Sequence, residues 1–168
     1  MELIESVFYT LCFAICTPQT KYINNRRVND ALIENDFYRK DILQLEKIVK
    51  PVRFYRNKAR YLLYAKRDFK EVLSVLGSMR DTTAKRNRIA EIVIGAGMKV
   101  ASEFMRDIGY NDLAILDVHI LKYMKRNPPR NQKEYLQLEK EFCEIAKRKG
   151  LSPGKFDSAI WEAYSGNK

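Results

Sequence analysis

The chain has 168 residues and a mass of 19.7 kDa, which corresponds to a single domain large enough to bury a core. Lysine and arginine number 31 against 21 aspartate and glutamate residues, so the formal net charge is +10. This surplus favours a polyanionic partner, nucleic acid before an acidic membrane surface, although solubility alone would also explain it. The low counts of glycine (7) and proline (5) argue against a loop-rich all-β protein.

The cysteines and the first apolar stretch restrict the class of protein further. Cys12, Cys16 and Cys143 lie in apolar runs, which indicates reduced core residues. They are too few for a four-cysteine iron–sulfur or zinc site, and one histidine excludes a histidine-based metal site. The uncharged stretch 6–20 is shorter than the about 20 apolar residues of a membrane span, and acidic residues precede it, unlike a signal peptide. We therefore expect an intracellular protein, of the cytoplasm or nucleoid, without a membrane partner.

Apolar residues recur at helical spacing along nearly the whole chain, without strand-like alternation. The stripe over 3–15 is wide enough for a buried central helix, which the turn at 17–20 ends. A strongly basic segment with interleaved aromatic residues follows Pro51. We expect further helices at 28–34, 40–49, 53–67, 69–76, 82–93, 98–108, 118–126, 132–149 and 155–164. The predicted fold class is all-α.

A glycine-containing turn, Gly95-Ala96-Gly97, separates the helices expected at 82–93 and 98–108. Such a hairpin leaves successive backbone N–H groups free at the start of its second helix, where they can bind a phosphate oxygen. Glycine is required where φ is positive or where a DNA backbone comes within contact distance. An ordinary turn between two helices would explain the same sequence.

Lys99 follows the second glycine by two residues and falls in the first turn of the next helix. The positive end of the helix dipole disfavours its charged form, and Lys85, Arg86 and Arg88 would act in the same direction if they lay nearby. A neutral lysine amine is the nucleophile of Schiff-base chemistry. A solvated lysine that contacts phosphate is the simpler alternative.

Asp117 stands eighteen residues after Lys99, within an apolar run that continues to Val118 and His119. A carboxylate in such a run is costly unless it has a role. Capping of the helix that begins at Val118 is a sufficient structural reason, and a capping carboxylate can also face a substrate. His119 by itself indicates a DNA contact or a core imidazole.

The sequence resembles the helix-hairpin-helix DNA glycosylase superfamily at Gly95, Gly97 and Lys99 and, eighteen residues after the lysine, in the segment Leu116-Asp117-Val118-His119. Four further segments are similar to the archaeal-type branch of 8-oxoguanine DNA glycosylase/AP lyases: Cys16–Gln19, Val52–Phe54 with Asn57–Tyr61, Asp112–Asp117, and Ser152–Asp157 with Trp161. The resemblance implies one glycosylase unit over 1–168, with two helical subdomains flanking an active-site cleft. One subdomain would cover about 20–95, the other 1–19 plus 96–168, and the hairpin about 82–108. Val118 departs from the family pattern, which often has a basic residue there.

The resemblance also implies roles for individual residues. Lys99 would be the nucleophile that displaces the oxidised base and forms a Schiff base, and Asp117 would stabilise the positive charge on the sugar. The residues implied to contact the DNA backbone are Gly95, Gly97, Arg53, Lys58, Arg60 and His119. Those implied to line the base pocket or to fill the gap left by the base are Gln19, Phe142, Asp157, Trp161 and Lys168.

The implied partner is double-stranded DNA containing 8-oxoguanine, and the implied oligomeric state is a monomer. No metal or iron–sulfur cluster is expected, although a monovalent cation could bind the hairpin backbone. Two alternatives stay open. A glycosylase for another oxidised base would typically carry a four-cysteine cluster, and a non-catalytic hairpin module would leave Lys99, Asp117 and Trp161 without a role.

Overall fold

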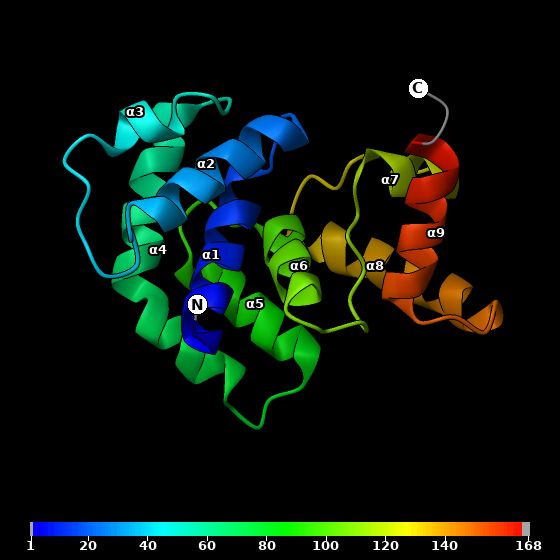
Figure 1. The fold of residues 1–168 in the computed structure, drawn as a ribbon. Helices are drawn as coiled ribbons and strands as arrows, with labels where there is room; N and C mark the ends of the chain where they lie inside the picture. The colour runs from blue at the N-terminus through cyan, green and yellow to red at the C-terminus, as the bar shows by residue number, and fades with distance from the viewer. Residues whose placement is uncertain (1, 166–168) are drawn as a thin grey trace. The chain divides into compact units, whose positions relative to one another are not determined.

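The computed structural model describes residues 2–165, and within them the chain forms nine α-helices joined by loops, without β-strands (Figure 1). The predicted all-α class is therefore confirmed. The helices are α1 (Leu3–Cys16), α2 (Tyr22–Glu34), α3 (Leu45–Val49), α4 (Tyr55–Leu76), α5 (Thr82–Ile92), α6 (Met98–Asp107), α7 (Val118–Met124), α8 (Gln132–Arg148) and α9 (Pro153–Ser165). No helix in this part of the chain is long and apolar enough to cross a membrane.

The chain divides into two compact units, the first ending at Phe104 and the second beginning at Met105. In the first unit α1 packs against α2 and α4, and α4 also packs against α3 and α5. In the second unit α9 packs against α7 and α8. The subdomains implied by the resemblance, about 20–95 and 1–19 plus 96–168, stay a prediction. The apolar stripe of α1 is covered by helices of its own unit.

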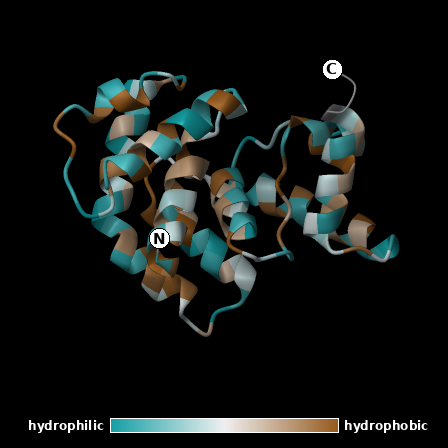
Figure 2. Cartoon of the chain, viewed as in Figure 1, coloured by the Kyte–Doolittle hydropathy of each residue, from teal (hydrophilic) through white to brown (hydrophobic). Residues whose placement is uncertain are grey.

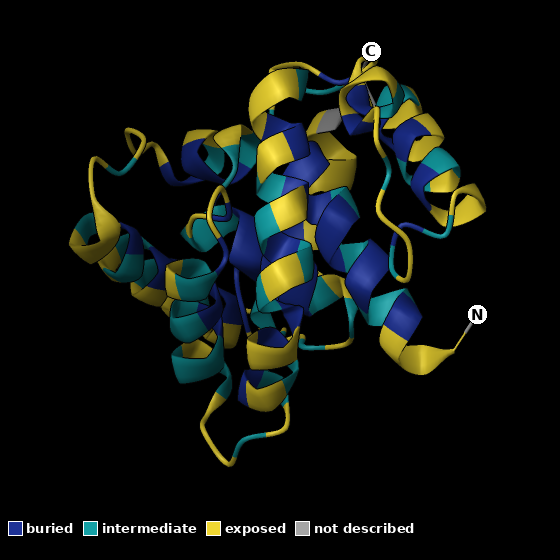
Figure 3. Cartoon of the chain, turned by 90° about the vertical axis from the view of Figure 1, so that its left-hand side faces the viewer, coloured by how far each residue is buried: buried dark blue, intermediate teal, exposed yellow. Residues whose placement is uncertain are grey.

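The core of the first unit is built around α1, as its wide apolar stripe predicts. Phe8, Leu11 and Ile15 are at most 1% exposed, and buried residues line one side of the helices in Figure 3. The ring of Phe8 packs against Phe69 of α4 at a centroid distance of 5.0 Å, in an edge-to-face arrangement. Cys12 is a free, buried thiol, in agreement with its expected place in the core.

Helix α4 is longer than the sequence pattern predicted. We expected two helices, at 53–67 and 69–76, but a single helix runs from Tyr55 to Leu76. Its buried residues Ala59, Leu62, Phe69 and Val72 keep helical spacing across the expected break, so one apolar side continues along the helix. Hydrophilic and hydrophobic residues alternate along the ribbon accordingly (Figure 2). The helix expected at 40–49 is instead shorter than predicted, because it forms only over Leu45–Val49.

Aromatic rings from α8 and α9 form the core of the second unit. Phe142 and Phe156 are stacked, with ring centroids 5.2 Å apart and planes inclined by 22°. Phe142 is fully buried. The hydroxyl of Tyr135 on α8 donates a hydrogen bond of 3.3 Å to the carbonyl of Ala114, which ties the segment before α7 to this core.

Candidate DNA-binding and catalytic site

The turn between α5 and α6 is a tight hairpin. The amide of Ala96 donates to the carbonyl of Val93 at 3.0 Å, and Gly95 has φ of 91°. The first helical hydrogen bond into α6 runs from Ala101 to the Gly97 carbonyl at 3.0 Å. The amides at 98–100 precede that bond and therefore have no acceptor within the helix. They are available to an anion at the positive end of the helix dipole.

The two glycines of the hairpin are required for different reasons. At Gly95, φ is positive and a β-carbon would overlap the ring of Tyr61 on α4, so only glycine fits. At Gly97, a β-carbon would have no atom within 4 Å. The protein itself therefore does not exclude a side chain at Gly97. Open space beside the free amides of α6 is what the approach of a nucleic-acid backbone requires.

Lys99 is the second residue of α6 and is half-buried. Among residues 2–165, its amine has no hydrogen bond or ion pair. Lys85, Arg86 and Arg88, the three cations that we expected near it, each have partners of their own. Lys85 donates to the carbonyl of Leu76, and the half-buried Arg88 pairs with Glu71 and Glu91.

Arg86 is fully buried and holds α5 against α6. Its guanidinium donates to the hydroxyl of Ser102 at 2.7 Å and to the side-chain oxygen of Asn87 at 2.8 Å. Ser102 lies three residues after Lys99, so it shares a side of α6 with the lysine. Arg86 thus links α5 to the helix that carries Lys99.

Asp117 caps α7, as predicted. Its Oδ1 accepts hydrogen bonds from the amides of His119 at 2.8 Å and Ile120 at 2.9 Å. Both bonds use the same oxygen, and in the described part of the chain Oδ2 accepts none. One carboxylate can thus anchor the helix and still present an oxygen to a substrate. Val118 beside it is 72% exposed, so the departure from the family pattern at this position leaves an apolar side chain in solvent.

Asp157 lies in the interior of the second unit and is 3% exposed. Its Oδ2 accepts from the Arg106 guanidinium at 2.7 Å and from the Ile115 amide at 3.0 Å. Burial raises the pKa of this carboxyl to about 6; Asp117 also raises it, whereas Arg106 and the Ile115 amide lower it. The role of Asp157 in a base pocket stays a prediction. In the structure its carboxylate is hydrogen-bonded to two groups of its own unit.

Lys58 is not the surface residue that we expected. It is 4% exposed, and its amine donates to the carbonyls of Cys16 and Pro18 at 2.7 and 2.8 Å and to the Thr20 hydroxyl at 2.9 Å. Burial lowers its pKa. The prediction that Lys58 contacts the DNA backbone is corrected: the ammonium holds the turn after α1, because that turn has carbonyl oxygens without helical partners.

The turn held by Lys58 presents Gln19, which is exposed and has a left-handed backbone with φ of 55°. The Arg53 amide donates to the Thr20 hydroxyl at 3.3 Å and ties a second loop to this turn. That loop presents Phe54, which is 53% exposed and also left-handed, with φ of 58°. Phe54 belongs to one of the segments that carry the family resemblance, but the sequence pattern placed it inside a helix, and its left-handed position just before α4 was not predicted.

The remaining predicted residues have varied surroundings. Arg53 and Arg60 are exposed, and the Arg53 guanidinium lies 4.9 Å from the ring centroid of Phe54. His119 is half-buried and Trp161 is 51% exposed. Phe142 is a core residue rather than an accessible stacking surface, since its ring is covered by Phe156. Lys168 lies outside the described residues.

Comparison with known proteins decides the family. Residues 2–151 match the family model described as 8-oxoguanine DNA glycosylase, with its helix-hairpin-helix. The chain belongs to the 8-oxoguanine DNA glycosylase family. A relative from Picrophilus torridus, an 8-oxoguanine DNA glycosylase/AP lyase, is 37% identical over 169 residues, covering 96% of this chain and 80% of the relative. The corresponding protein of Thermoplasma volcanium is 33% identical over 167 residues, covering 96% and 81%.

Solved structures of the 8-oxoguanine DNA glycosylase family share the fold. The chain is similar to the Methanocaldococcus jannaschii glycosylase with a TM-score of 0.86 and 30% identity, over 98% of this chain and 80% of that one. It is equally similar to the same glycosylase in complex with a 15mer DNA containing 8-oxoguanine, at 29% identity, covering 98% and 83%. The helix-hairpin-helix glycosylase fold that the motifs implied is confirmed.

Proposed function

We propose that this family member excises 8-oxoguanine from double-stranded DNA and cleaves the strand at the resulting abasic site through a Schiff base on Lys99. The observation that carries the proposal is the position of Lys99: its amine follows the open Gly97 turn and has no competing partner in the described chain. Relatives of this chain include 8-oxoguanine DNA glycosylase/AP lyases, and a structural neighbour is bound to DNA containing 8-oxoguanine.

The reaction needs an amine, a carboxylate and water, with no metal or organic cofactor. The neutral amine of Lys99 attacks C1′ of the damaged nucleotide, and the glycosidic bond breaks so that the base leaves with the electron pair and takes up a proton. Opening of the C1′–O4′ bond then gives an imine between Lys99 and the sugar. Loss of a proton from C2′ expels the 3′ phosphate, and water releases the lysine. Asp117 stabilises the positive charge on the sugar with Oδ2, the oxygen that does not cap α7.

The target base must leave the helical stack before this attack, at a cost of a few kcal/mol. We propose that Gln19 fills the gap, since its turn is exposed and its backbone is held by Lys58. Arg53, Arg60 and the hairpin amides bind phosphates, and His119 binds the backbone near Asp117. Trp161 is proposed to stack on the extruded base. The protein acts as a monomer inside the cell, in the cytoplasm or nucleoid, where chromosomal DNA is accessible.

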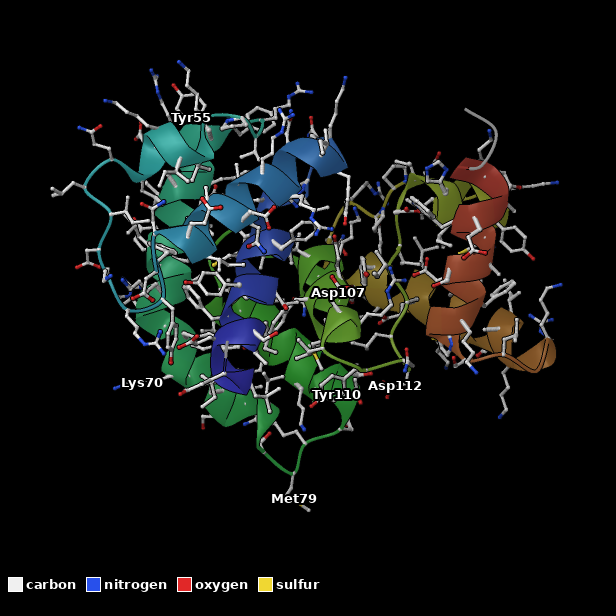
Figure 4. The ribbon with its side chains drawn as sticks, viewed as in Figure 1. Tyr55, Lys70, Met79, Asp107, Tyr110 and Asp112 are labelled. Atoms are coloured by element: carbon white, nitrogen blue, oxygen red, sulfur yellow. The ribbon has the colours of Figure 1, made fainter. Side chains whose placement is uncertain are left out.

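Borohydride trapping tests the catalytic proposal directly. Reduction of the imine on a duplex with one 8-oxoguanine should give a covalent adduct with the wild-type protein and none with Lys99→Gln. The matched control is Lys70→Gln, because Lys70 is an exposed lysine on α4 that points away from the protein (Figure 4). DNA binding by Lys99→Gln should stay within about tenfold of wild type. Binding without any adduct from the wild-type protein would identify a non-catalytic hairpin module instead.

A further inference from the structure

The carboxylate of Asp157 joins three segments of the second unit through one oxygen atom. Oδ2 accepts from the Arg106 guanidinium near the end of α6 and from the Ile115 amide in the segment before α7. Asp157 itself lies on α9. Helix α6 is also the helix whose first turn carries Lys99. A single buried group therefore contacts the helix of the proposed nucleophile and the segment that leads to the proposed stabilising carboxylate.

Hydrogen bonds continue from Asp157 to Asp117. The peptide of Ile115 donates its N–H to Asp157, and its carbonyl accepts from the Asp117 amide at 2.8 Å. Asp117 then caps α7 through Oδ1. Because the segment before α7 is neither helix nor strand, its backbone has no ladder to fix it. Beside the Tyr135 hydroxyl, which donates to the Ala114 carbonyl, the Asp157 carboxylate supplies a second anchor of the kind that regular secondary structure would supply elsewhere.

A charged anchor at this place is costly, which makes its presence informative. The Asp157 side chain has lost most of its water, whereas the Arg106 side chain is 26% exposed. A buried charge of this kind often stabilises a protein less than an apolar residue of the same shape, because the ion loses its water. An aspartate that met only the packing needs of α9 could be replaced by an apolar residue without loss. Its two directional hydrogen bonds are what an apolar side chain could not provide.

We propose that Asp157 is a positioning residue, which sets the place of the Asp117 carboxylate through the Ile115 peptide and the Arg106 guanidinium. The inference rests on the proposed glycosylase and lyase function, and it adds a residue that touches neither base nor sugar. Since Asp117 acts in base release and in the Schiff-base steps alike, loss of the anchor slows both reactions.

The anchor also makes catalysis depend on pH. The charged and titratable groups that face the Asp157 carboxyl are Arg106 from α6 and Asp117 from the segment before α7. The pKa of Asp157 is about 6, so its carboxyl group is mostly ionised above that pH and mostly protonated below it. Protonation weakens the ion pair with Arg106 and the bond to Ile115. Excision by the wild-type protein should therefore fall as the pH drops through about 6.

The test compares Asp157→Asn with wild type on two duplexes, one containing 8-oxoguanine and one containing an abasic site. The amide keeps an acceptor oxygen for Ile115 but loses the charge that pairs with Arg106. We expect single-turnover rates at pH 7.5 to fall by about 10- to 100-fold on both duplexes, the range of a displaced catalytic group. The fall in rate near pH 6 should disappear. Asp112→Asn is the control, because Asp112 is exposed on the same segment (Figure 4).

Two further variants cover the case in which Asp157→Asn folds poorly. Arg106→Lys keeps a cation for Asp157 and should retain most activity, whereas Arg106→Met removes it and should lower both rates. Melting temperatures of all variants show whether the rates refer to folded protein.

Three results would overturn the proposal. Loss of 8-oxoguanine excision with unchanged abasic-site cleavage would assign Asp157 to direct base contact. Unchanged rates on both duplexes would leave it a packing residue. A fall near pH 6 that persists in Asp157→Asn would assign that titration to another group. Failure of the proposed function is distinct from all three, because the wild-type protein would then give no product or trapped adduct.

Discussion

The ring of Tyr61 occupies the space beside Gly95, so that a β-carbon placed on Gly95 would lie 2.6 Å from the Cγ atom of that ring. The same glycine has φ of 91°, which a side chain disfavours independently. Gly95→Ala should therefore lower the free energy of unfolding by about 2–4 kcal/mol, from backbone strain and overpacking together. Thermal or denaturant unfolding measures this change, and a melting temperature equal to wild type would show that the hairpin can shift away from α4.

Gly97→Ala should behave in the opposite way, since a β-carbon there meets no atom within 4 Å. We expect unfolding to be unchanged, within about 0.5 kcal/mol. DNA affinity should fall by about tenfold or more, because the methyl group takes the space that a phosphate would enter; tenfold corresponds to about 1.4 kcal/mol. Fluorescence anisotropy with a duplex measures the affinity. Unaltered affinity would mean that the DNA backbone does not approach this glycine.

Asp117→Asn should lower the excision rate by about 100-fold or more, the scale of losing one electrostatic stabiliser. Asparagine caps helices as well as aspartate does, and its oxygen can accept from the amides of His119 and Ile120. The melting temperature should consequently stay near that of wild type. If the protein instead melts early while each folded molecule keeps its rate, Asp117 acts as a cap alone.

Lys58→Met should destabilise the protein without changing how its DNA binding depends on salt. The substitution leaves the carbonyls of Cys16 and Pro18 without their ammonium partner, and each buried polar group left unpaired costs about 1–3 kcal/mol. We expect a loss of about 2–4 kcal/mol in urea unfolding. Lys70→Met is the matched control, because Lys70 is exposed on the same helix. A stable variant with a reduced salt slope would return Lys58 to the DNA-binding surface.

Arg53→Ala should lower the slope of log K against log salt for undamaged duplex by up to about one unit, since each neutralised phosphate contributes about 0.9. Arg53 is exposed and has no ion pair within residues 2–165. Arg130→Ala serves as the control, because Arg130 is already paired with Glu134. Equal slopes for both variants and wild type would show that the surface around Arg53 does not contact DNA.

Asp157 should also leave a signature in the pH dependence of stability. Its pKa is about 6 in the folded protein and near 3.9 in an unfolded chain, so between these values the folded state binds more protons. The contribution of this group to the free energy of unfolding therefore falls as the pH rises from about 4 to 6, by at most about 1.4 kcal/mol per pH unit. Asp157→Asn should remove that contribution. A difference between variant and wild type that does not change with pH would contradict the raised pKa.

The parts of the fold that the sequence predicted well are those with local signals. The hairpin glycines, the cap at Asp117 and the apolar stripe of α1 each rest on residues close together in the chain. Helix boundaries were less accurate at 53–76, because a change from basic to apolar composition looked like a break. Packing of α4 against several partners makes it one helix.

Side-chain roles that depend on distant contacts could not be predicted. Lys58 looked like any other lysine of a basic segment, and only the folded chain places the open carbonyls of the turn after α1 around its amine. Asp157 likewise gave no signal of its bond to Ile115, which lies 42 residues earlier in the chain. The exposure of Phe54 follows from its left-handed backbone, which the sequence does not reveal for a residue other than glycine.

Lys58 and Tyr61 are one turn apart on α4, and each supports a different loop of the first unit. The ammonium holds the turn with Gln19, and the ring sits against the hairpin at Gly95. Both loops are thus fixed to the same helix, so a sliding or rotation of α4 would move them together. A duplex bound by these loops would therefore contact two sites that keep a constant distance from each other. The bending needed to extrude a base would then occur in the DNA rather than in this part of the protein.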